Sequence, residues 1–88
     1  MYAVLVSVTV EDEERAREQL AERVVPAVSA IPGAVHGYWL APVGGEGYST
    51  VIFETQEAAT DAAAQVQDRA PQGVTVNDVS VREVVAHF

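Results

Sequence analysis

Residues 2–10 read YAVLVSVTV, the clearest secondary-structure signal in the chain. Every second residue from Val4 to Val10 is valine, while alanine, leucine, serine and threonine occupy the other parity. Valine-rich alternation of this length is typical of a β-strand. Because both parities are apolar or small, we expect both faces of the strand to be covered.

A helix is expected directly after this strand. The acidic run Glu11–Glu14 suits the positive end of a helix, with Thr9 or Asp12 as the N-cap. Apolar residues then recur at steps of three and four, which predicts one buried stripe of Ala16, Leu20, Val24, Val28 and Ile31. Pro26 lacks a helical N–H, so we expect a kink or an early end there, and Pro32-Gly33 stops the helix in any case.

The rest of the chain predicts strands over 35–41, 48–54 and 74–86, and a helix over 56–69. Pro42 and Gly44-Gly45 mark a hairpin loop between the first two of these strands. Thr55 is a good N-cap for the alanine-rich helix, which Pro71-Gln72-Gly73 ends. The last strand is expected to break at Asn77-Asp78.

This order is β-α-β-β-α-β. Two right-handed βαβ units joined by a hairpin give a four-stranded antiparallel sheet with both helices on one face. The first and third strands are then central, and the second and fourth are edges. We therefore predict a single α+β domain over residues 1–88 with a ferredoxin-like fold.

The sheet face away from the helices lacks a clean polar pattern. Strand 2–10 offers it Ala3, Leu5, Ser7 and Thr9, and neither parity of strand 48–54 is polar. When one face of a sheet is solvated, apolar and polar residues normally alternate along its strands. Because this alternation is missing here, we expect a partner to cover the face. The simplest partner is a second copy packed through the sheet faces, which predicts a homodimer. The alternative is a monomer with an apolar face that tends to aggregate.

Composition excludes several classes of function. The 88 residues carry a net charge of −8, with five arginines and no lysine, which disfavours nucleic acids and anionic membranes as partners. There is no cysteine, so neither disulfides nor thiolate metal sites are expected. The N-terminus lacks the basic segment of a signal peptide, and no apolar run approaches the roughly 18 residues of a membrane span. We expect a soluble, cytoplasmic protein.

Four segments, together with the element order, resemble the dimeric α/β-barrel proteins: Val24-Val25-Pro26, Ile31-Pro32-Gly33, Gly37-Tyr38-Trp39-Leu40 and Val51-Ile52-Phe53-Glu54. The chain is most similar to small actinobacterial proteins related to antibiotic-biosynthesis monooxygenases. The resemblance implies a dimer whose two sheets form a barrel, with a ligand cavity between sheet and helices in each subunit. It also implies a cofactor-independent monooxygenase acting on a small aromatic, polyketide-like substrate. The alternative is a non-catalytic dimer that binds a small hydrophobic ligand or a protein.

Haem-degrading members of that superfamily use a histidine on the second helix, together with an asparagine and a tryptophan. Residues 56–69 contain no histidine, and residues 2–10 contain no asparagine. The two histidines of the chain also have no acidic cluster beside them. We therefore expect neither a cofactor nor a metal site.

His36, Tyr38 and Trp39 are the candidate catalytic residues. His36 and Tyr38 share one parity of a strand, so a base and a hydrogen-bond donor would lie on the same face. Trp39 points to the opposite face and is a candidate cavity residue. The structural alternatives are a solvated edge histidine, a tyrosine at the dimer interface and a tryptophan in the core.

Overall fold

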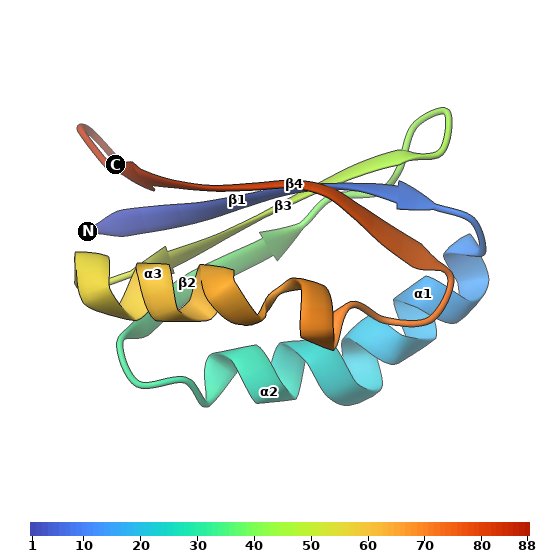
Figure 1. Cartoon of the computed structure of the whole chain (residues 1–88), viewed down its shortest axis with the longest axis horizontal. Helices are drawn as coiled ribbons and strands as arrows, with labels where there is room; N and C mark the ends of the chain where they lie inside the picture. The colour runs from blue at the N-terminus through green and yellow to red at the C-terminus, as the bar shows by residue number, and fades with distance from the viewer.

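The computed structural model describes residues 1–88 (Figure 1). Its strands are β1 (Tyr2–Val10), β2 (Ala34–Trp39), β3 (Glu46–Phe53) and β4 (Val74–Glu83). The first helix consists of α1 (Glu13–Gln19), a π-helical turn η1 (Leu20–Val24) and α2 (Val25–Ser29). The second consists of α3 (Gln56–Gln65), followed by a 3₁₀ turn η2 (Gln67–Arg69). The predicted β-α-β-β-α-β order is confirmed.

The four strands form one open antiparallel sheet in the order β2-β3-β1-β4. As predicted, β1 and β3 are central and β2 and β4 are edges. Figure 1 shows α1, α2 and α3 below the sheet, while the opposite face carries no helix. The protein therefore has the predicted α+β fold, with a ferredoxin-like arrangement of a sheet and two helices on one face.

The alternation along β1 assigns the two faces of the sheet. Val4 lies opposite Val51 and Val81, whereas the next residue, Leu5, lies opposite Thr50 and Ser80. Residues directly opposite one another project to the same face, so the valines face the helices and Leu5 faces away from them. The buried core comprises Val4, Val6, Phe53 and Ala59. The valines of β1 therefore form the face that the helices cover.

The strand ends differ from the prediction where pairing partners run out. β2 ends at Trp39, two residues before the predicted end at 41, because Pro42 has no N–H to continue the ladder. β4 ends at Glu83 and not at 86, because β1 begins at Tyr2 and offers no further partner residues. The backbone N–H of Val84 donates the last bond of this ladder, to the carbonyl of Met1 at 2.9 Å.

The predicted break at Asn77-Asp78 is a bulge within one continuous strand. Ser7 pairs with Asp78 but Val8 pairs with Val76, which leaves Asn77 as an extra residue. The side-chain amide of Asn77 donates a hydrogen bond to Thr9 Oγ1 at 2.8 Å. The bulge therefore keeps the valines of β4 on the helix side on both sides of the irregularity.

Polar side chains cap both helices. Of the two predicted N-caps for α1, Asp12 is the one used, since its Oδ1 accepts from the backbone N–H of Arg15 at 3.1 Å. Thr55 caps α3 as predicted, and its Oγ1 accepts from the N–H of Ala58 at 3.1 Å. The caps satisfy backbone donors that a helix leaves free at its N-terminus.

Pro26 does not end the first helix. The helix widens into the π-turn η1, where the N–H of Val25 donates to the carbonyl of Leu20, five residues earlier. Along a regular α-helix, Val28 would be rotated about 120° from Ala16, because twelve steps of about 100° exceed three full turns. A π-turn adds one residue to a turn, which reduces that rotation to about 20°. The π-turn therefore keeps the predicted apolar stripe on one side of the helix.

This geometry predicts how the helix tolerates changes of length. Deleting Ala21 together with Pro26→Ala should give a regular α-helix with the same stripe, and a free energy of unfolding within about 1 kcal/mol of the parent. Inserting one alanine after Ala21 in the Pro26→Ala background turns Val24 and Val28 away from the sheet. It should cost about 2 kcal/mol or more. Urea unfolding followed by circular dichroism measures the free energy of unfolding of both variants. Equal stability of the two variants would contradict the role of the π-turn in keeping the apolar stripe on one side of the helix.

Candidate functional site

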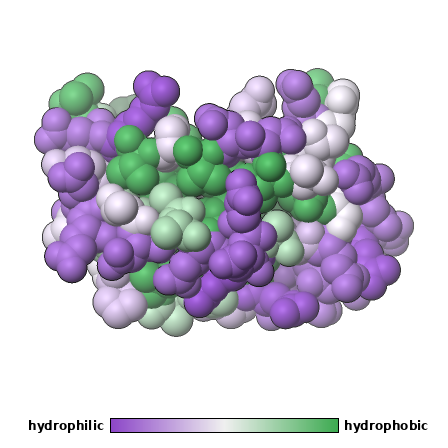
Figure 2. Space-filling view, in the orientation of Figure 1, coloured by the Kyte–Doolittle hydropathy of each residue, from purple (hydrophilic) through white to green (hydrophobic).

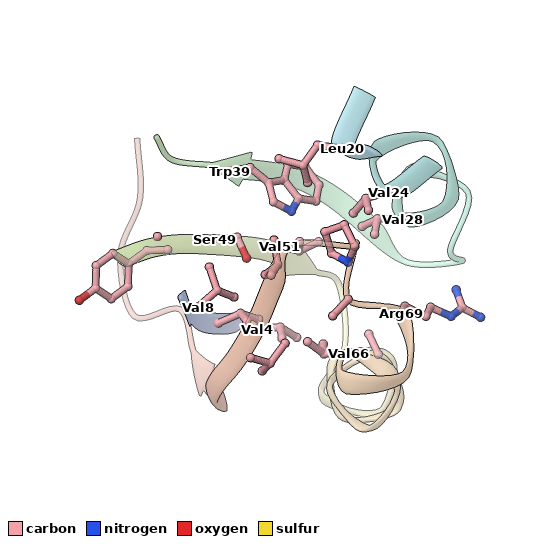
Figure 3. A pocket seen from close by; sticks show the side chains of 18 of the residues that line it. Val4, Val8, Leu20, Val24, Val28, Trp39, Ser49, Val51, Val66 and Arg69 are labelled. Carbon is pink, nitrogen blue, oxygen red and sulfur yellow. The ribbon is translucent and has the colours of Figure 1, made fainter. Parts of the chain in front are cut away.

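A large cavity lies between the sheet and the two helices. Its volume is about 810 Å³, and 21 of its 33 lining residues are hydrophobic. This size lies within the range of small-molecule sites, roughly 300–1,000 Å³. Figure 3 shows the walls: Val4, Val8 and Val51 project from the sheet, Leu20, Val24 and Val28 from the first helix, and Val66 from the end of α3. The structure thus contains a hollow, mainly aliphatic site.

The cavity exists because the helices fill the space on their side of the sheet incompletely. α3 packs on β1, β3 and β4 through small side chains such as Ala58, Ala62 and Ala63. The first helix contacts β2 through α2, whereas α1 and η1 have few contacts with the strands. Leu20, Val24 and Val28 are therefore only half-buried, and they face the cavity and not a filled core. Figure 2 shows apolar side chains, in green, in a band between the sheet and the helix layer.

Charged and polar side chains lie at the opening of this cavity. The exposed residues of the rim include Glu13, Arg17, Glu57, Asp61, Gln65 and Arg69. Arg17 is held by Glu13, with its Nη2 2.9 Å from Glu13 Oε2. Figure 3 shows the guanidinium of Arg69 pointing away from the cavity. The rim is therefore solvated, and the charges stay outside the apolar interior.

Trp39 projects into the cavity from β2, as the sequence predicted for its parity. It is half-buried, and Figure 3 shows its indole beside Leu20, with the ring nitrogen turned toward the cavity. Gly37 makes this orientation feasible, because a Cβ at that position would lie 2.9 Å from Cη2 and Cζ3 of Trp39. The six-membered ring of the indole thus lies against Gly37, and its pyrrole edge is left for the cavity.

Ser49 is a cavity residue that the sequence analysis did not single out. It shares the parity of Val51 and Phe53 on β3 and lies directly opposite Trp39 in the β2–β3 pairing. The parity of β3 was readable from the sequence. The pairing with Trp39 was not, because it depends on the conformation of the loop between the strands. Gly44 and Gly45 both have positive φ there, of 60° and 82°.

His36 and Tyr38 lie on the other face of the sheet. Both are exposed, neither lines the cavity, and their ring centroids are 6.4 Å apart. The predicted parity is right, since the two rings are neighbours, but the sheet separates them from the cavity that holds Trp39. The three candidate catalytic residues therefore do not form one site.

The face that carries His36 and Tyr38 has an uncharged centre. The outward residues of the central strands are Ala3, Leu5, Ser7, Thr9, Tyr48, Thr50 and Ile52. The charged side chains stand at the margins, with Asp78 and Arg82 on edge strand β4 and Glu46 at the end of β3. Among the large side chains, Leu5 is 37%, Tyr48 54% and Tyr38 56% exposed. This face is less apolar than the sequence suggested, because hydroxyl groups alternate with the larger side chains.

No three histidine, aspartate or glutamate side chains of the chain gather in a way that could hold a metal ion. None of the helices combines the length and the apolar character needed to cross a membrane. A comparison with known protein families finds no match to this chain, and a comparison with curated proteins finds none either. The indications of function therefore come from the fold and the cavity.

Proposed function

We propose that this protein binds a small, largely apolar molecule in the cavity between its sheet and its helices. The observation that carries the proposal is the 810 Å³ space lined mainly by aliphatic side chains. Apolar surface exposed to water costs about 25 cal/mol for each Å². An apolar ligand that covers the aliphatic lining of the cavity would therefore gain binding free energy in proportion to the area it buries. The charged residues of the rim do not reach the interior, which supports a ligand with an apolar body.

Filling the cavity from the helix side tests this function. Val24→Phe places a larger side chain in the cavity, and it should weaken binding of fluorene, a flat tricyclic hydrocarbon, about tenfold or more. The matched control is Val25→Phe, because Val25 is the next residue, is 40% exposed and does not line the cavity. Equilibrium dialysis with increasing protein measures both affinities. Absence of fluorene binding by the parent protein, or equal loss in both variants, would refute a ligand site at this place.

A second candidate is a cofactor-independent monooxygenase, related to the antibiotic-biosynthesis monooxygenases that the sequence resembles. Trp39 favours it, because an aromatic side chain in an apolar cavity can orient an aromatic substrate. Oxygen would react directly with the bound, deprotonated substrate at a CH₂ carbon. One oxygen atom would become a carbonyl and the other would leave as water, so the carbon supplies all four electrons.

Oxygen uptake with an anthrone-type phenol separates catalysis from binding alone. If the cavity is catalytic, Trp39→Phe should slow uptake about tenfold, whereas His36→Ala and Tyr38→Phe should leave it unchanged, because those side chains lie on the opposite face. Loss of uptake in His36→Ala would instead assign the chemistry to the outer face. No uptake above the buffer rate, with fluorene still bound, would leave binding as the function.

We also propose that the protein acts as a homodimer through its bare sheet faces, as in a dimeric α/β barrel. An uncharged centre with charges at the margin is the composition of a protein interface. The β2–β3 hairpin and the C-terminal segment both rise on this side of the sheet (Figure 1). They carry Val43 and Val85, which are 82% and 91% exposed in one chain. A second copy would cover these apolar side chains.

A charge at the centre of that face tests the dimer. Leu5→Glu should give a particle with the mass of one chain, because a buried, unpaired carboxylate costs several kcal/mol. The parent protein and the control Ala64→Glu, on the exposed side of α3, should give twice that mass. Light scattering at micromolar concentration measures all three. A parent protein with the mass of one chain would contradict the dimer.

A further inference from the structure

The interior of the cavity presents two polar side chains, Trp39 and Ser49. Ten of the lining residues have polar or ionisable side-chain atoms. Of the other eight, Tyr48 turns its side chain to the opposite face of the sheet, and the rest are exposed: Glu13, Arg17, Thr55, Glu57, Asp61, Gln65 and Arg69. Trp39 and Ser49 are both half-buried, and they are neighbours across β2 and β3. A ligand in the cavity would therefore meet its polar groups at one place.

Neither side chain is occupied by the rest of the protein. The side-chain hydrogen bonds of the chain involve the caps, the helix surface, the bulge and Thr75, and none of them uses Trp39 or Ser49. An indole N–H can only donate, and a serine hydroxyl can both donate and accept. Both groups are thus free to donate to an acceptor on a ligand, and a polar group removed from water favours such a partner.

Resting on the proposed function, we propose that Trp39 Nε1 and Ser49 Oγ bind a carbonyl-type oxygen of a neutral, otherwise apolar ligand. An acceptor on the ligand suits this position, because an indole N–H can only donate and Trp39 makes no side-chain hydrogen bond within the protein. Figure 3 shows Trp39 and Ser49 on the same wall of the cavity, with aliphatic side chains around them. The apolar body of the ligand would lie against Leu20, Val24 and Val28, and its oxygen would point to the two strands.

Charge argues for a neutral ligand. The rim holds three carboxylates, of Glu13, Glu57 and Asp61, against Arg17 and Arg69, and Arg17 is already paired with Glu13. No charged side chain reaches the interior, so a buried anion would lose its hydration without gaining a counterion. The net charge of −8 adds a long-range repulsion of anions. A carbonyl compound meets these conditions better than a carboxylate does.

A pair of ligands that differ by one oxygen tests the assignment. Fluorenone carries a carbonyl where fluorene carries a CH₂ group, and the two are otherwise alike in shape. Equilibrium dialysis gives the ratio of their dissociation constants for the parent protein, Trp39→Phe, Ser49→Ala and the double variant. We expect the preference for fluorenone to fall about threefold in each single variant and about tenfold in the double variant. The different hydrophobicity of the two ligands cancels when this ratio is compared between the parent protein and a variant.

Ser80→Ala is the matched control, because Ser80 lies on a strand of the same sheet but faces away from the helices. It should leave the preference unchanged, and circular dichroism checks that every variant is folded. An unchanged ratio in the double variant, with both ligands still bound, would overturn the role of Trp39 and Ser49 and leave the cavity function intact. If neither ligand binds the parent protein, the proposed function itself fails. Tighter binding of fluorene-9-carboxylate than of fluorenone would overturn the preference for a neutral ligand.

Discussion

The structure depends on one constraint, the alternation of side chains along the central strands. In β1 it assigns Val4 and Val6 to the helix layer and Leu5 to the opposite face. The same alternation on β2 separates Trp39 from Tyr38. A shift of one residue in register would exchange the two faces along a whole strand, so the glycine loop and the Asn77 bulge, which fix the register, also fix which side chains line the cavity.

The cavity results from how the helices meet that surface. Alanines bring α3 close to the sheet and the valines of β1, while the π-turn keeps Leu20, Val24 and Val28 on the inner side of the first helix. The helix wall and the sheet wall are both aliphatic, so the space between them favours an apolar molecule over water. The aliphatic walls do not favour any one orientation of a bound molecule. The indole N–H of Trp39 is a directional hydrogen-bond donor in this cavity.

Much of the fold was predictable because it rests on local patterns. Alternation in β1, the cap at Thr55 and the stop at Pro32-Gly33 all lie within a few residues, and the structure confirms them. Of the kink or early end predicted at Pro26, the early end does not occur, because the helix continues to Ser29 after a π-turn that fits the four-residue spacing of the stripe. At the site, the alternation along β2 predicted that Trp39 and Tyr38 face opposite sides of the sheet. The pairing of Trp39 with Ser49 was not predictable, because it depends on a loop conformation that no short pattern encodes.

We expect a ligand to bind on the helix side of the sheet. Isotope-filtered nuclear Overhauser spectroscopy of the protein with bound fluorene tests this most directly, because it reports which methyl groups lie near the ligand. We expect contacts from fluorene protons to the methyl groups of Val24, Val28 and Val51. Contacts confined to Leu5 and Ile52, on the opposite face, would contradict it.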